Sequence, residues 1–196
     1  MLKLLNLSAE INNMVEKSFK NDIRFKNYVN VFFRNFMKKS SFTSYYMVEF
    51  CDIELKRKDN SDKENNELFK AIINLFCLLE DQDVFIKEYS NKLALRLLYK
   101  SYSSIEAENL MIKNLSLACG LNNVNKLTSM IKEIMLTKDL INEYRQIDDY
   151  NLIKAMGVEF DALVLANGHW NIQRRAPCIL PLEIKNITIN FEKFYK

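Results

Sequence analysis

Apolar side chains recur at helical spacing along most of the chain. Apolar residues three and four positions apart predict amphipathic helices. Such a stripe cannot be buried by one helix alone, so we expect the helices of residues 1–146 to pack together as a bundle. The clearest series are Phe25, Tyr28, Val29, Phe32 and Phe36; Leu68, Ile72, Phe76 and Leu79; Phe85, Tyr89, Leu93 and Leu97; and Val124, Leu127, Met130, Ile131, Ile134 and Met135.

Polar segments separate these series at residues 40–41, 58–66, 101–104 and 120–123. Ser103 and Glu106 have the spacing of a capping box, which predicts the start of a further helix. Gly120 has the position of a helix stop, because glycine readily adopts the left-handed conformation that ends many helices.

The pattern changes after residue 146. Residues 147–157 are predicted to form a linker. Residues 160–166 alternate weakly between apolar and polar positions, which is typical of a strand. Gly168, His169 and Trp170 follow, and residues 182–195 could form a short helix. The predicted fold class is therefore mainly α, a helical bundle followed by a small, incomplete α/β element over residues 158–196.

Composition excludes several classes of protein. The chain has three glycines and two prolines, and the first of these five is Gly120, which excludes an all-β fold with tight turns and a glycine-rich phosphate loop. Lys and Arg number 28 against 25 Asp and Glu, and the pI of about 8.5 is below that typical of nucleic-acid binders. The longest uncharged apolar run, residues 71–79, is too short to span a bilayer.

The reactive residue types form no convincing catalytic or metal site. Cys51, Cys77, Cys119 and Cys178 contain no CxxC pair, and His169 is the only histidine, so neither a zinc site nor another cofactor is expected. Free thiols are typical of the cytoplasm or nucleus. His169 and Cys178 could form a thiol–imidazole pair, but the sequence offers no third group to orient them. We expect no catalytic residues.

Two acidic residues also have alternative interpretations. Asp81 and Asp83 could suggest paired carboxylates or a metal site, but they precede or open a predicted helix. Capping of that helix N-terminus is the favoured interpretation.

Five motifs in order resemble the cullin family. They are FCD with LK at residues 50–56; LLEDQDVF at 78–85 running into Tyr89, Leu93 and Arg96; SYSSIEAENLMIKNLSLACG at 101–120; KLTSM at 126–130 with KDL at 138–140; and VLANGHW at 164–170 with LP at 180–181 and FEKFY at 191–195. Asn171 stands where the family usually has proline after the tryptophan. The resemblance covers a four-helix-bundle segment and the first strand region of the α/β domain.

The resemblance implies a non-catalytic scaffold segment of a cullin–RING E3 ubiquitin ligase. Such a scaffold positions a zinc-containing RING-box protein and, through it, a ubiquitin-conjugating enzyme, for ubiquitin-dependent protein degradation. The adaptor-binding stalk, the C-terminal winged-helix elements and the lysine that accepts the ubiquitin-like modifier are expected to lie outside this chain.

The same resemblance implies two binding sites. Leu163, Val164 and Leu165 would lie in the sheet that accepts a strand of the RING protein, with Trp170 packed near it. The alternative is that these residues pair only with the cullin's own strands. Lys56, Arg57 and Lys58 would contact the acidic tail of a conjugating enzyme, or else form a solvated helix end.

Other functions stay open at this point. The chain could be a helical adaptor that has lost ligase assembly, or a cullin-like subunit of the anaphase-promoting complex. A nucleic-acid-binding bundle and an enzyme with Cys178 as nucleophile are less favoured. No membrane partner is expected.

Overall fold

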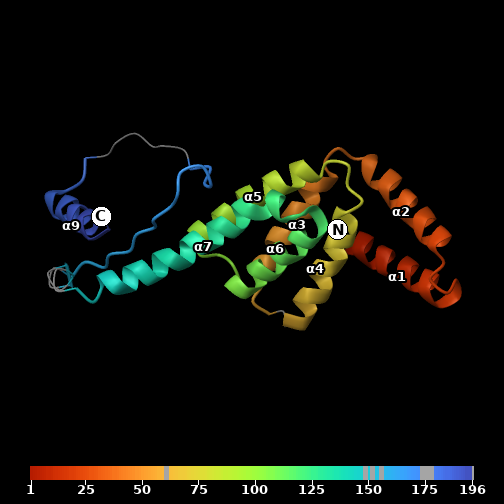
Figure 1. The fold of residues 1–196 in the computed structure, drawn as a ribbon, viewed down its shortest axis with the longest axis horizontal. Helices are drawn as coiled ribbons and strands as arrows, with labels where there is room; N and C mark the ends of the chain where they lie inside the picture. Colours follow the sequence, from red (N-terminus) through yellow and green to blue (C-terminus); the bar gives the residue numbers. More distant parts are fainter. Residues whose placement is uncertain (60–61, 148–149, 151–152, 155–156, 173–178, 196) are drawn as a thin grey trace. The chain divides into compact units, whose positions relative to one another are not determined.

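The computed structural model describes residues 1–59, 62–147, 150, 153–154, 157–172 and 179–195, and within these it contains helices and no strand (Figure 1). The prediction of a mainly helical chain is confirmed. The helices are α1 (Leu2–Ser18), α2 (Ile23–Lys38), α3 (Thr43–Lys56), α4 (Asp62–Phe76), α5 (Gln82–Leu98), α6 (Ile105–Cys119), α7 (Leu121–Tyr144) and α9 (Leu182–Tyr195).

The chain divides into two compact units, Met1–Thr128 and Ser129–Lys196, and α7 contributes to both. The predicted boundaries at residues 146 and 157 remain a prediction, and the predicted linker lies only partly within the described residues. Each unit has a hydrophobic core of its own.

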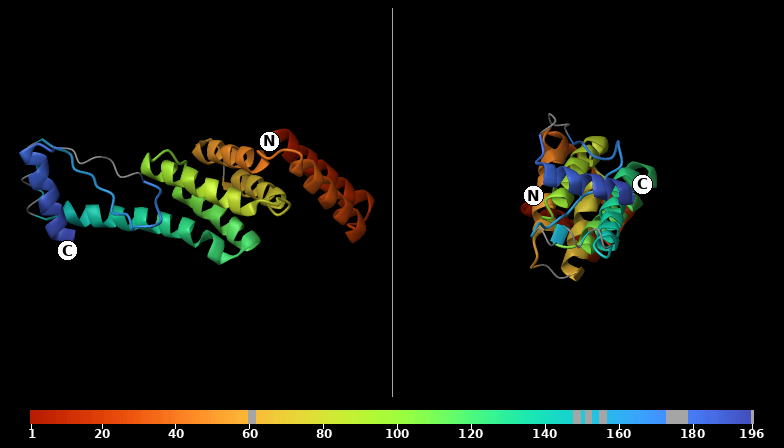
Figure 2. Two further views of the ribbon diagram at one scale, coloured as in Figure 1. Left: turned by 90° about the horizontal axis from the view of Figure 1, so that it is seen from above. Right: turned by 90° about the vertical axis from the view of Figure 1, so that its left-hand side faces the viewer.

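In the first unit, α3 packs against α5, α4 against α6, and α1 against both α2 and α4 (Figure 2). The stripes predicted on α4 and α5 supply much of this core. Ile72, Phe76, Phe85, Tyr89, Leu93 and Leu97 are all at most 1% exposed.

Most of the apolar stripe predicted on α2 is exposed rather than buried. This helix buries Phe33 and Met37, whereas Tyr28, Phe32 and Phe36 are 76%, 53% and 49% exposed. The buried and the exposed residues lie on neighbouring faces of one helix, so helical periodicity alone did not distinguish them.

At the helix ends, two predicted N-terminal caps differ from the structure, and one predicted helix stop is confirmed. Ser104, not Ser103, caps α6, and its hydroxyl oxygen accepts a hydrogen bond of 3.0 Å from the Ala107 amide. Gly120 ends α6 with a positive φ of 88°, as predicted. Asp81 occupies the N-cap position of α5, but its carboxylate accepts from the Ser44 hydroxyl at 2.7 Å and makes no side-chain cap of the helix.

A buried ion network joins three helices of the first unit. Arg96 on α5 donates to Glu108 on α6 at 2.6 and 2.9 Å and to Asp52 on α3 at 2.7 Å. The Tyr89 hydroxyl donates to Glu108 at 3.3 Å, and Lys56 donates to Asp52 at 2.6 Å. Two cations thus balance two carboxylates, which lets Arg96, Asp52 and Glu108 stay buried although Lys56 is exposed.

The second unit is built around a cluster from α7, α9 and the chain between them. Ile141 and Tyr144 of α7, Ile153, and Ile187 and Phe191 of α9 form its buried centre. The predicted short helix at residues 182–195 is therefore present, as α9.

The α/β element predicted over residues 158–196 is absent from the described residues. Residues 158–166 run in an extended conformation without forming a strand. Among the described residues they make no backbone–backbone hydrogen bond, and instead bind side chains of α7. The prediction of a strand is therefore wrong: the alternation is real, but no second strand in the described part of the chain pairs with it.

Candidate docking site along helix α7

An extended segment, residues 158–166, lies on the core of the second unit with one face inward. Val158, Phe160, Ala162 and Val164 pack against the buried cluster. Leu163, between two inward positions, is 38% exposed. This period of two follows from extended backbone, in which successive side chains point to opposite sides.

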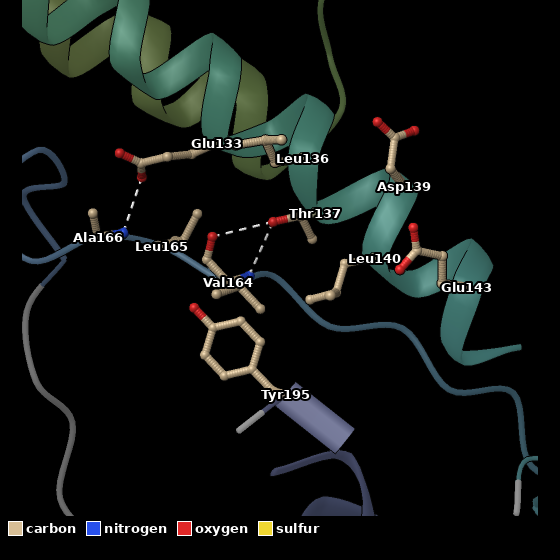
Figure 3. A pocket seen from close by; sticks show the side chains of 10 residues that line it. All are labelled: Glu133, Leu136, Thr137, Asp139, Leu140, Glu143, Val164, Leu165, Ala166 and Tyr195. Carbon is tan, nitrogen blue, oxygen red and sulfur yellow. Dashed lines mark hydrogen bonds between the residues drawn. The ribbon is translucent and has the colours of Figure 1, made fainter. Parts of the chain in front are cut away.

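Thr137 of α7 holds the middle of this segment. Its hydroxyl oxygen accepts from the Val164 amide at 3.2 Å, and the same hydroxyl donates to the Val164 carbonyl at 3.1 Å (Figure 3). Thr137 is buried and Val164 is half-buried, so both bonds are partly shielded from water. One side chain thereby satisfies both polar backbone groups of Val164, a role that a neighbouring strand would otherwise fill.

Glu133, one turn earlier on α7, holds the end of the segment. Its Oε2 accepts from the Ala166 amide at 3.0 Å and from the Trp170 indole Nε1–H at 2.6 Å. The Nδ1 atom of His169 lies 2.5 Å from Oε1, and because a carboxylate only accepts, Nδ1–H is the donor. Burial by itself would raise the pKa of Glu133, but these hydrogen bonds lower that pKa below its usual value.

A pocket of about 430 Å³ opens between α7, the extended segment and the end of α9 (Figure 3). Leu136, Leu140, Val164, Leu165, Ala166 and Tyr195 give it a largely apolar lining. Asp139 and Glu143, four residues apart on α7, border it together with Glu133, and no Lys, Arg or His is among its described lining residues. The pocket is therefore both apolar and negatively charged.

The four residues predicted to contact a RING protein lie in this region, in different environments. Val164 and Leu165 line the pocket, and Leu163 faces away from the core. Trp170 is only 9% exposed, with its indole bound to Glu133, as a packing anchor would be.

The basic residues predicted to contact a conjugating enzyme lie at the end of α3 in the first unit. Lys56 forms an ion pair with Asp52, and Arg57 with Glu54 at 3.0 Å, so two of the three positive charges are already balanced. Lys58 is exposed just beyond the helix.

The structure also describes three of the four cysteines and bears on a metal site and a membrane span. Cys178 lies outside the described residues, so its predicted pairing with His169 is not addressed. Cys51, Cys77 and Cys119 are free thiols, and burial raises the pKa of Cys51 to about 12. In the described part of the chain, no three His, Cys, Asp or Glu side chains converge as a metal site would require. None of the described helices has both the length and the hydropathy needed to cross a bilayer.

Glu133 and Thr137 were not predicted from the sequence as site residues. Glu133 sits among Met130, Ile131 and Ile134, and its i, i+4 spacing to Thr137 places both side chains on one face of α7. That spacing was the only available signal, and it does not by itself indicate a partner segment.

The helical fold agrees with what sequence comparison shows. A model of the cullin family, described as the cullin alpha solenoid domain, matches residues 1–141. The chain belongs to the cullin family.

Two relatives from Dictyostelium discoideum align over almost the whole chain. Cullin-3 is 31% identical over 194 residues, and Cullin-1 is 28% identical over 205 residues; each alignment covers 98% of this chain. The alignments cover 25% and 27% of the two relatives, so the chain spans about a quarter of their length.

Proposed function

We propose that this chain is a non-catalytic scaffold segment of a cullin–RING E3 ubiquitin ligase. The observation that carries the proposal is membership of the cullin family over residues 1–141, together with relatives that align over 98% of the chain. The proposed role is to hold a RING-box protein, and through it a ubiquitin-conjugating enzyme, near a substrate for degradation. The catalytic benefit of such a scaffold is proximity and orientation.

The proposed RING contact is the outward side of the extended segment. Leu163 is exposed, and the backbone on either side of Val164 makes no strand pairing among the described residues. A partner strand could bind there through main-chain hydrogen bonds, with selectivity from alternate side chains. Trp170 and Val164 would support this contact from the core side of the segment and would not touch the partner.

Site-specific photocrosslinking tests this contact. A photoreactive amino acid replaces Leu163, or Tyr28 on α2 as an exposed control, and the chain is mixed with a RING-box protein. We expect a crosslink from position 163 and none from position 28. We expect no stable co-elution in gel filtration, because no described residues form a second strand beside the extended segment. Equal crosslinking from both positions would contradict the proposed contact.

The absence of catalytic chemistry needs its own test. The chain is incubated with a ubiquitin-charged conjugating enzyme and examined on a non-reducing gel. We expect no thiol-sensitive ubiquitin adduct. An adduct that disappears in Cys178→Ala would show that the chain is an enzyme and would overturn the scaffold proposal.

The proposed contact with a conjugating enzyme's acidic tail is weak and electrostatic. Because Lys56 and Arg57 are already paired, the available charge is centred on Lys58, and exposed ion pairs contribute only about 0–1 kcal/mol each. We expect Lys58→Glu to slow association at low salt and to have no effect at high salt. Lys63→Glu, at the start of α4, is the matched control. Equal association rates for wild type and Lys58→Glu at low salt would leave only a solvated helix end.

A further inference from the structure

We propose that the pocket beside α7 binds a basic peptide segment of a partner protein, with one apolar side chain inserted and flanking Lys or Arg side chains on its acidic border. This goes beyond the scaffold function proposed above and does not depend on it. The occupant follows from the shape, the lining and the charge of the pocket.

The size and lining favour insertion of a side chain. A volume of about 430 Å³ is at the small end of the range for ligand sites and accommodates one large side chain with part of its backbone. Leu136 is 66% exposed and Tyr195 is 55% exposed, so both present apolar surface that an inserted side chain would cover.

The charge of the border selects the flanking residues. Asp139 and Glu143 are exposed and lie one turn apart on α7, and neither forms an ion pair with another described residue. Glu133 is different, because its carboxylate is already bound by Trp170, His169 and the Ala166 amide. Two carboxylates are thus available to a cation next to an apolar wall, which is the complement of a basic–apolar peptide.

The position of the pocket favours a peptide over a small cation. Residues 164–166 form one wall as extended chain, fixed to α7 by Thr137 and Glu133 (Figure 3). An occupant that runs along this wall can place its side chain over Leu136 and Leu140 and its cationic groups towards Asp139 and Glu143. A small cation could satisfy the carboxylates only and would leave the apolar wall exposed.

The test uses fluorescence anisotropy with the full chain and a labelled short peptide that has a central leucine flanked by arginines. We expect binding that weakens as salt rises. A peptide with glutamates in place of the arginines, and one with glycine in place of the leucine, should each bind about tenfold more weakly or worse. Equal binding of all three peptides would overturn the proposal.

Variants of the chain locate the binding. The double variant Asp139→Asn with Glu143→Gln should weaken the arginine–leucine peptide about tenfold, since it removes two charges without changing size. Leu136→Ser should also weaken it, while leaving the core intact because Leu136 is largely exposed. The control, Glu10→Gln with Glu67→Gln, removes two exposed charges of the first unit and should have no effect. Equal weakening by the control would show non-specific attraction and overturn the site.

Competition with acetylated arginine amide separates a peptide site from a small-cation site. We expect no displacement of the labelled peptide at concentrations where the unlabelled peptide displaces it fully. Full displacement by the amino-acid derivative would overturn the proposed occupant. Because no RING protein is present in any of these experiments, their failure would leave the scaffold proposal standing.

Discussion

Arg96 is the largest of the fully buried side chains, and it is held by two carboxylates that come from other helices. Burial by itself would lower its pKa, but the hydrogen bonds and charges of Glu108 and Asp52 raise that pKa above its usual value. The guanidinium therefore stays charged. Because Arg96, Asp52 and Glu108 lie on α5, α3 and α6, a single side chain fixes how three helices meet.

Replacing Arg96 should be strongly destabilising. Arg96→Met keeps most of the volume but leaves Glu108, which is fully buried, without its cation. Breaking a buried pair in this way costs about 3–5 kcal/mol of unfolding free energy. Urea denaturation measures the loss, with Arg34→Met, an exposed arginine of α2, as the control. A loss for Arg96→Met no larger than that of the control would contradict the role of the network.

Glu133 should make the second unit sensitive to acid. Its pKa in the folded chain is lowered below the usual 4.5, so the unfolded chain binds a proton more readily than the folded one. The stabilisation is therefore fully present above pH 4.5 and is lost as the pH falls through the lower folded pKa.

The one tryptophan of the chain, Trp170, reports on this loss because its indole is bound to Glu133. We expect its emission to shift to the red below pH 4.5, as the protonated carboxyl releases the indole and its segment. In Glu133→Gln this acid-dependent step should be absent. A step of the same size and midpoint in that variant would assign it to another group.

At the scale of the element, α5 shows why helices were predictable from sequence. Phe85, Tyr89, Leu93 and Leu97 repeat every four residues and are all buried, so the apolar pattern alone located the helix and its buried face. In α2 the same kind of pattern located the helix but not the face, because Phe33 and Met37 lie beside the longer aromatic series.

The extended segment, by contrast, makes contacts that the local sequence did not predict. Its weak alternation indicates extended backbone, but residues 162–166 are all apolar, so the pattern does not show which side chains face inward or what satisfies the backbone. In the structure, Thr137 and Glu133 do so from α7. A threonine and a glutamate on a helix are ordinarily solvent-exposed residues, so the contact between them and residues some 30 positions away could not be predicted from local sequence.

Leu93 provides a test at this scale, with a control on the same helix. Leu93 is completely buried, whereas Leu95, two residues away, is 49% exposed. Leu93→Ala should cost about 2–5 kcal/mol of unfolding free energy, because it removes buried contacts and leaves a cavity. Leu95→Ala removes the same atoms from a half-exposed site and should cost much less. Thermal melts followed by circular dichroism give the comparison, and equal losses would contradict the assigned face of α5.

At the scale of the whole molecule, the two units have separate cores. The first is built by α1 to α6 and the beginning of α7, and the second by the end of α7, Ile153, residues 158–164 and α9. Phe191 of α9 has the central place in the second core, with its ring 5.1 Å from Tyr144 and 5.3 Å from Phe160. Each core can therefore be weakened by a substitution that leaves the other unchanged.

Two probes and two substitutions test whether the units unfold separately. Far-UV circular dichroism reports mainly on the first unit, which contains six whole helices, while Trp170 emission reports on the second. In urea, Leu93→Ala should lower the midpoint of the dichroism transition more than that of Trp170 emission. Phe191→Ala, which should cost about 3–5 kcal/mol, should do the reverse, because it removes the ring that packs on Tyr144 and Phe160. If each substitution moved both midpoints equally, the helix α7 that runs through both units would be coupling them into one cooperative domain.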